Sequence, residues 1–286
     1  MRITDRYLED VLAGKASLLF DGAMGTMIQQ AGLSADVLDR LCVTNPEGIA
    51  AIHRAYVEAG SQAIITNTFS SNSRKLGNAE EVERVYAAAV ACARDAGARY
   101  VAGDIGPLGY LLDPLGDLLY EEAYELFAEQ ARAIEKTDAD LVIIETMADV
   151  QEIEAAVQAV HDNCDLPVFA SMTFRADGMT YLGCSVETAV AKLMELDVDV
   201  LGANCSVVPK DMRGVAAKLL ALSDRPVIVQ ANAGTPEVVD GKPTYTLTPE
   251  DYARDTQPIV DAGVRILGGC CGTNPAFIAE LAKLLA

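Results

Sequence analysis

The chain has 286 residues, of which 51% are hydrophobic and 22% charged, a composition typical of a globular protein with a large core. Its formal net charge of −20 argues against nucleic acid and anionic membranes as partners, because both are bound by basic patches. The sequence has no membrane-length apolar window, and its first ten residues lack the apolar core of a signal peptide. Seven cysteines, an odd number, without an export signal predict reduced thiols and a cytoplasmic location.

The first half of the chain alternates short apolar runs with helical stretches. Residues 17–22 form an apolar run that ends in Asp-Gly, which predicts a strand followed by a turn. Asn45, Pro46 and Glu47 are typical of a helix start, with Asn as the cap, Pro at the first helical position and Glu in the first turn. The same reasoning predicts strands at 62–67, 99–104 and 140–146, and helices at 46–59, 80–96 and 120–136.

The second half repeats this alternation. A further helix start is predicted at Thr248-Pro249-Glu250, where Thr is the cap. Strands are predicted at 167–174, 199–205, 226–232 and 264–270, and helices at 150–161, 186–196, 209–222, 248–262 and 275–285.

The eight strand–helix units predict one α/β domain over residues 1–286, a (βα)8 TIM barrel. The strands are continuous apolar runs, as in parallel sheets that are buried on both faces. A doubly wound sheet is the alternative, but no Gly-x-Gly-x-x-Gly follows the first strand. The longest irregular pieces, at about 25–45, 69–78, 108–119 and 232–247, all follow strands, so we expect them on one face.

The predicted strands end in polar or metal-ligating residues. In a TIM barrel the chemistry lies at these C-terminal strand ends. Asparagine, aspartate and glycine are also common turn formers, so no single position is decisive. The end residues are Asp21, Gly22, Thr66, Asn67, Asp104, Glu145, Thr173, Asn204, Cys205, Gln230, Asn232, Cys270 and Cys271.

Two adjacent cysteines, Cys270 and Cys271, lie between glycines after the eighth strand. Adjacent cysteines rarely pair with each other, and flanking glycines let the backbone aim both sulfurs at one point. Cys205 ends the sixth strand, which is separated from the eighth by one strand around the barrel. Three thiolates predict a zinc site with one open position, which is the catalytic arrangement. The alternative is three buried, inert cysteines.

The remaining cysteines and both histidines have no such spacing. Because the histidines fall in predicted helices of the outer layer, we expect neither to be catalytic. The cysteines are expected to be packing residues. These residues are Cys42, Cys92, Cys164, Cys184, His53 and His161.

A zinc site with an open position suits a thiol substrate, because a coordinated thiol is held as the nucleophilic thiolate. Asp21 and Glu145 could hold a substrate ammonium group, and backbone amides near Gly22, Ala23 and Met24 could receive a carboxylate. The alternative for the two acids is turn chemistry or a solvated charge.

Seven motifs, spread over almost the whole chain, resemble the homocysteine S-methyltransferase family, and more narrowly the homocysteine-binding domain of its cobalamin-dependent methionine synthase branch. They lie at 21–26, 66–69, 103–107, 144–146, 204–206, 232–234 and 268–273. The resemblance implies zinc on Cys205, Cys270 and Cys271. It also implies that Asp21 and Glu145 bind the amino group of homocysteine, and that an oxygen of Asn232 fills the fourth zinc position until the thiol displaces it.

The form of the first and last motifs favours methylcobalamin as the methyl donor. We therefore expect the zinc-bound homocysteine thiolate to take a methyl group from a methylcorrinoid and to form methionine. The 286 residues leave no room for folate, cobalamin and reactivation modules, so the corrinoid would be carried by a partner protein or domain that docks transiently at the barrel mouth. The alternatives are S-methylmethionine, S-adenosylmethionine or betaine as the donor, another thiol as the acceptor, or a non-catalytic scaffold for a corrinoid protein.

Overall fold

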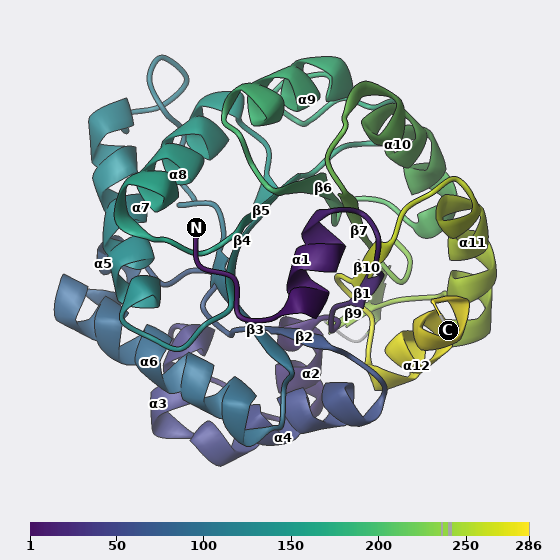
Figure 1. Ribbon diagram of the computed structural model, residues 1–286. Coiled ribbons are helices and arrows are strands. Elements are labelled where there is room, and N and C mark those ends of the chain that lie inside the picture. Colours follow the sequence, from purple (N-terminus) through teal and green to yellow (C-terminus); the bar gives the residue numbers. More distant parts are fainter. Residues whose placement is uncertain (236, 240–241, 286) are drawn as a thin grey trace.

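Eight parallel strands form a nearly closed barrel at the centre of the molecule (Figure 1). The computed structural model describes residues 1–235, 237–239 and 242–285. The strands follow the order β1-β10-β7-β6-β5-β4-β3-β2, and a bridge between Phe20 and Ala63 brings β1 beside β2. This closure confirms the predicted TIM barrel and excludes the doubly wound sheet. The strands are β1 (Leu18–Leu19), β2 (Ala63–Ile65), β3 (Tyr100–Ile105), β4 (Leu141–Met147), β5 (Val168–Met172), β6 (Val200–Asn204), β7 (Val227–Ala231) and β10 (Ile266–Gly269).

Eight long helices surround the barrel (Figure 1). The two predicted caps are confirmed, because the Asn45 side chain accepts a hydrogen bond from the Gly48 amide and the Thr248 hydroxyl accepts one from the Asp251 amide. The boundaries lie within a few residues of those predicted. The helices are α4 (Pro46–Glu58), α6 (Ala79–Asp95), α7 (Tyr120–Glu135), α8 (Val150–Asn163), α9 (Val186–Glu195), α10 (Pro209–Leu222), α11 (Pro249–Asp261) and α12 (Pro275–Leu284).

A short helix that the sequence did not predict, α1 (Arg6–Leu12), covers one end of the barrel (Figure 1). Its Leu8 and Val11 are fully buried against barrel-interior side chains such as Phe20 and Ile266. Seven residues are too few for a clear helical period. The helix is therefore stabilised mainly by the apolar surface that it buries.

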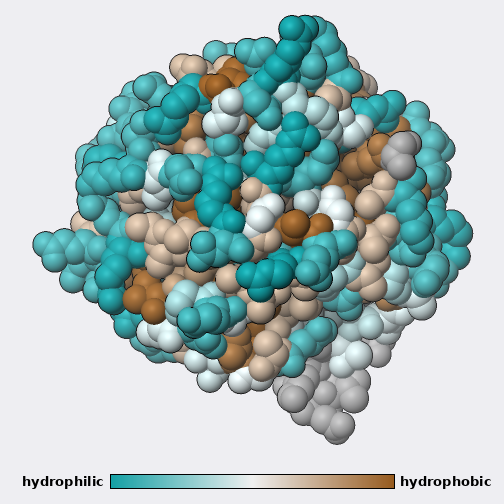
Figure 2. Space-filling model, turned by 60° about the horizontal axis from the view of Figure 1, so that its bottom comes forward, coloured by the Kyte–Doolittle hydropathy of each residue, from teal (hydrophilic) through white to brown (hydrophobic). Residues whose placement is uncertain are grey.

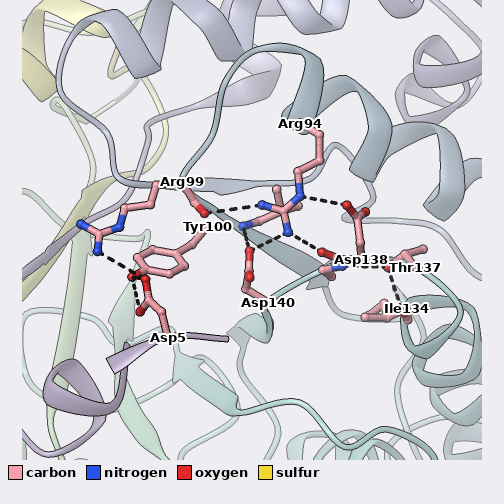
Figure 3. Close-up of polar contacts among 10 residues, drawn as sticks. Asp5, Arg94, Arg99, Tyr100, Ile134, Thr137, Asp138 and Asp140 are labelled. Carbon is pink, nitrogen blue, oxygen red and sulfur yellow. Dashed lines mark hydrogen bonds and ion pairs between the residues drawn. The ribbon is translucent and has the colours of Figure 1, made fainter. Parts of the chain in front are cut away.

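Polar contacts attach α1 to the start of β3 (Figure 3). The Asp5 carboxylate caps α1 at the Leu8 amide, and it accepts a hydrogen bond of 2.7 Å from the Tyr100 hydroxyl. Beside it, Asp140 accepts hydrogen bonds of 2.8 Å from Arg94 and from the Val101 amide. The buried Asp140 and the exposed Asp5 are thus both paired at this end of the barrel.

Three of the four segments predicted as irregular contain short elements, which corrects that prediction for them, whereas 108–119 has no helix or strand. Each element has only a few residues and depends on contacts with other segments; for example, the Asp39 carboxylate accepts hydrogen bonds from the Ser70 amide and the Ser71 hydroxyl. The elements are α2 (Met24–Gln30), η1 (Leu38–Arg40), α3 (Leu41–Thr44), α5 (Ser73–Leu76), β8 (Glu237–Val239) and β9 (Lys242–Thr244). Of the predicted ranges, Pro236, Asp240, Gly241 and Ala286 lie outside the described residues.

The outer surface is mostly hydrophilic on the face shown in Figure 2, where strongly hydrophobic side chains form only small, separate groups. Within the described part of the chain, no helix combines the length and the apolar character needed to cross a membrane.

The loop between β3 and α7 is held by a buried acid from α8. Glu152 accepts a hydrogen bond of 2.8 Å from the Leu108 amide, and burial raises the pKa of its carboxyl group from 4.5 to about 7. The unfolded chain loses this proton near pH 4.5, whereas the folded chain keeps it until about pH 7. The free energy of unfolding should therefore fall by about 3 kcal/mol across this window and stay lower above it.

Replacing Glu152 with glutamine keeps the acceptor for Leu108 and removes the titration. We expect the variant to match the wild-type chain near pH 4.5 and to exceed its unfolding free energy at pH 8 by up to about 3 kcal/mol. Urea unfolding at both pH values measures this difference. A variant that is less stable at pH 8 would contradict the raised pKa.

Candidate active site

A cavity of about 500 Å³ opens at the C-terminal ends of the strands. Its lining includes six of the seven residues that the sequence singled out for substrate or metal, and Asn232 is the exception. The predicted residues that line it are Asp21, Gly22, Glu145, Cys205, Cys270 and Cys271. Neither histidine lines this cavity, because His53 lies in α4 and His161 in α8.

The three predicted cysteines converge at one side of the cavity. The Sγ atoms of Cys205, Cys270 and Cys271 all lie within 4.8 Å of one another, and those of Cys205 and Cys271 are 3.9 Å apart. Tetrahedral zinc with Zn–S bonds of about 2.3 Å places two sulfurs about 3.8 Å apart, so this donor set fits zinc. Among the described residues no other group of three or more His, Cys, Asp and Glu side chains is arranged in this way. Their role as metal ligands stays a prediction.

Strained backbone aims Cys205 into this cluster. Cys205 and the next residue, Ser206, have left-handed φ angles of 61° and 57°, which are unfavourable for residues with a side chain. Hydrogen bonds from the amides of Cys205 and Cys270 to the carbonyls of Gln230 and Ala231 fix both cysteines to β7, the strand between them.

The glycines around the cysteine pair serve two different purposes. Gly272 has a φ of 82°, so it supplies the left-handed turn, and a Cβ atom here would lie 2.2 Å from the Tyr245 ring. A Cβ atom at Gly269 would lie 2.4 Å from Thr273 Oγ1, although its φ is not positive. Only one of these two glycines is therefore needed for its conformation, and the other is needed for close packing.

The sulfurs of Cys205 and Cys271 are 3.9 Å apart, and an amide side chain lies beside the cluster. Hydrogen bonds from Cys270 and Cys271 lower the pKa of the Cys205 thiol to about 3, and the interaction with Cys205 raises the pKa of the Cys271 thiol to about 11. Asn232 is 5% exposed and its side chain contacts Cys205. No described residue donates a hydrogen bond to its buried Oδ1, which leaves an oxygen free to act as a further ligand.

Two of the carboxyl groups that line the same cavity are the predicted Asp21, which is buried, and Glu145, which is partly exposed. Asp21 is 2% exposed, and its Oδ2 accepts a hydrogen bond of 3.2 Å from the Ile65 amide, whereas its buried Oδ1 has no donor among the described residues. Burial, and then the charge of Glu145, raise the pKa of Asp21 above its usual value. Burial, and then the charge of Cys205, raise the pKa of Glu145 to about 7. Both groups would ionise more readily beside a cation.

The backbone after Asp21 is packed tightly against the cysteine loop. A Cβ atom at Gly22 would lie 2.6 Å from Thr273 Oγ1, so only glycine fits there. The Ala23 amide already donates to Thr273 Oγ1, and it is therefore not free for a substrate carboxylate as expected. The amides of Gly22 and Met24 have no acceptor among the described residues.

Asn204 is a site residue that the sequence analysis named only as a strand end. It is fully buried, and its Nδ2 donates to Glu145 Oε2 at 3.1 Å and to Thr146 Oγ1 at 2.7 Å. Its Oδ1 accepts from the Thr146 amide and the Ser171 hydroxyl, both at 2.8 Å. Asn204 is thus held by Thr146 and Ser171, and one of its two N–H donors orients the Glu145 carboxylate. Its position next to Cys205 was the only sequence signal.

Two further residues were missed because nothing in the local sequence identifies them. The Tyr56 hydroxyl from α4 donates to the Ala23 and Thr273 carbonyls, at 3.1 and 3.4 Å, and so links the two loops. Tyr245 packs its ring over Gly272, which follows the cysteine pair. Both act across more than 25 positions of the sequence.

Known proteins resemble this chain along nearly all of its length. The family model described as homocysteine S-methyltransferase matches residues 18–285. Methionine synthase from Mycobacterium tuberculosis is 33% identical over 306 aligned residues, and that from Mycobacterium leprae is 32% identical over 316. The metallated crystal form of the homocysteine methyltransferase MmuM from Escherichia coli superimposes with a TM-score of 0.82 at 26% identity, covering 97% of this chain and 99% of that one.

The two kinds of relative differ in length. The alignments cover 99% and 100% of this chain but only 26% of each methionine synthase, so the chain spans about a quarter of the length of these curated relatives. The Escherichia coli enzyme, in contrast, is matched over almost its whole chain.

Proposed function

The chain belongs to the homocysteine S-methyltransferase family, and from that premise we propose that it transfers a methyl group to the thiol of homocysteine and forms methionine. One observation carries the proposal: three clustered cysteine sulfurs and the carboxyl groups of Asp21 and Glu145 line one cavity. Homocysteine carries a thiol and an ammonium group, and these two sets of residues match them. In this proposal residues 1–286 form one homocysteine-binding (βα)8 methyltransferase domain.

Zinc is the metal that Cys205, Cys270 and Cys271 would hold, because thiolate ligands in tetrahedral geometry select it. When bound, zinc supplies the positive charge that keeps an acceptor thiol deprotonated near neutral pH. The buried Oδ1 of Asn232, without a donor among the described residues, supports its proposed role as the fourth ligand before the acceptor arrives.

The other site residues bind and orient the acceptor. Asp21 and Glu145 accept hydrogen bonds from its ammonium group, and Asn204 fixes the Glu145 carboxylate. The amide of Gly22 is available for the carboxylate end. Holding both ends of the amino acid leaves the sulfur in one position, which lowers the entropic cost of alignment with the methyl group.

The proposed methyl donor is methylcobalamin, carried by a corrinoid-binding protein or domain. The name and greater length of the mycobacterial methionine synthases support this choice. Apolar side chains that a docking partner could cover are exposed on two loops at the cavity end of the barrel. On the β3–α7 loop these are Tyr110, Leu111, Leu115 and Leu119, and on the β5–α9 loop Tyr181 and Leu182.

A small sulfonium or ammonium compound is the second candidate donor. It is favoured by the similarity to the Escherichia coli homocysteine methyltransferase, which is matched over 99% of its chain and so consists almost entirely of this barrel. S-methylmethionine, S-adenosylmethionine and betaine belong to this chemical class.

Methionine formation with each donor in turn tests the proposal. We expect the zinc-loaded chain to demethylate free methylcobalamin only when homocysteine is present, and to contain about one zinc per chain. Transfer from a small donor but not from methylcobalamin would replace the proposed donor. Transfer to a different thiol but not to homocysteine would replace the acceptor. A chain with neither zinc nor activity would be a scaffold instead.

A further inference from the structure

A further carboxyl group, buried like that of Asp21, lines the cavity and has no assigned role. Asp104 lies in β3 and is 2% exposed. Its buried Oδ1 receives no hydrogen bond from any described residue. A buried carboxyl oxygen without a donor is costly, so it calls for a specific explanation, such as a catalytic role or a bound ion.

The neighbouring hydroxyl groups cannot satisfy this side chain, because they are already engaged with the Asp104 backbone. The Asp104 amide donates to Thr66 Oγ1 at 3.0 Å, and Thr68 Oγ1 donates to the Asp104 carbonyl at 2.9 Å. The two threonine hydroxyls bond each other at 2.8 Å, and the Tyr86 hydroxyl donates to the same carbonyl at 2.7 Å. These bonds hold the residue in place, while Oδ1 of its carboxyl group has no donor among the described residues.

The cavity provides no cation for Asp104. Of the described residues that line it, only Lys75 is positively charged, and its Nζ lies 5.6 Å from the centre of the exposed Tyr110 ring on a surface loop. Burial, and then the charges of Glu145, Asp39 and Asp21, raise the pKa of Asp104 well above its usual value. The missing partner is therefore a cation that arrives with a ligand.

We propose that Asp104 is the third carboxyl group of the ammonium subsite and makes the enzyme prefer thiol acceptors that carry an amino group. An ammonium group has three N–H donors. Oδ1 of Asp21, Oδ1 of Asp104 and the Glu145 carboxylate are three acceptors with unused capacity in one cavity. This inference rests on the proposed function and adds a residue that determines specificity.

The test compares three thiols in the zinc-loaded full chain, wild type and Asp104→Asn. Homocysteine has both charged groups, 4-mercaptobutyrate lacks the amino group, and 3-aminopropane-1-thiol lacks the carboxylate. We expect KM for the two aminothiols to rise about 10- to 100-fold, the loss of one charged hydrogen bond, with kcat changed less than about threefold. KM and kcat for 4-mercaptobutyrate should stay the same, so the variant should prefer thiols with an amino group less strongly than the wild type does.

Asp39→Asn is the matched control, because Asp39 is a buried acid lining the same cavity whose carboxylate is bonded to Ser70 and Ser71. The ratio of its KM for homocysteine to its KM for 4-mercaptobutyrate should equal that of the wild type. Asp104→Ala should reproduce the Asp104→Asn pattern, and thermal unfolding verifies that both variants fold.

Calorimetric binding of the same thiols separates the possible failures. A wild-type chain that binds homocysteine no better than 4-mercaptobutyrate would overturn both the proposed function and this inference. If the wild type binds homocysteine more tightly than 4-mercaptobutyrate and the Asp104→Asn variant does so by the same factor, only the inference is overturned. The inference would also be overturned if the Asp104→Asn variant lost affinity only for the thiols that carry a carboxylate. Asp104 would then act as a proton donor to that carboxylate.

Discussion

Replacing Cys270 with serine is expected to prevent stoichiometric zinc binding and to lower kcat/KM for homocysteine methylation by on the order of 1,000-fold. Cys270 is one of three sulfurs that lie within 4.8 Å of one another. An unactivated thiol is only a few per cent thiolate at neutral pH, which costs about 30-fold. The loss of a fixed position for the sulfur costs about 100-fold more.

Zinc analysis after exhaustive dialysis, together with initial rates, measures this effect. Cys184→Ser is the matched control, because Cys184 is a buried free thiol of the β5–α9 loop that donates to the Ser185 carbonyl, as a serine can. It should keep the zinc and the activity of the wild type. If Cys270→Ser retained both, the proposed metal centre would be wrong. Treatment of the wild type with a chelator should reproduce the loss, and added zinc should reverse it.

Replacing Asn204 with alanine is the second change from which we expect a large effect. The substitution leaves Glu145, Thr146 and Ser171 without hydrogen-bond partners at a fully buried position. Each unsatisfied buried group costs about 1–3 kcal/mol, so we expect the free energy of unfolding to fall by about 2–4 kcal/mol after partial relaxation. Because Glu145 is no longer oriented, kcat/KM for homocysteine should fall about 100-fold, mainly through KM.

Ser171→Ala provides the comparison, since it removes one bond to Asn204 Oδ1 and keeps those that hold Glu145. We expect it to lose about 1 kcal/mol of stability and to keep kcat/KM within about threefold. Zinc content should be unchanged in both variants. An Asn204→Ala enzyme that loses activity equally with 4-mercaptobutyrate, which has no amino group, would show that Asn204 does not act through Glu145.

The fold could be predicted because its signals are local and repeated. Continuous apolar runs mark the strands, and caps such as Asn45 and Thr248 mark helix starts, so eight units could be counted along the chain. The short elements could not be predicted. In α1, for example, Leu8 and Val11 are helical mainly because their burial beneath the barrel favours it, and that burial exists only in the folded chain.

The cysteine cluster was predictable for a similar reason. Two adjacent cysteines between glycines are seldom needed for packing alone. The strand order places Cys205 near them, with only β7 between their strands. The roles of the remaining site residues could not be predicted in this way, because they depend on which hydrogen bonds each side chain makes in the folded chain. Asn204 and Asp104 both end apolar strands and look alike in the sequence.

The sequence by itself therefore determined the barrel, the side of the barrel that carries the cavity and the residues around its rim, because these follow from hydrophobic periodicity and from strand order. Only the tertiary structure decided what each polar residue does. Both polar groups of the Asn204 side chain are hydrogen-bonded, and one of these bonds orients Glu145. Asp104 is equally buried but has a carboxyl oxygen without a donor among the described residues. That difference depends on groups brought together from distant parts of the chain, and the free energy of burying a polar group depends on those partners.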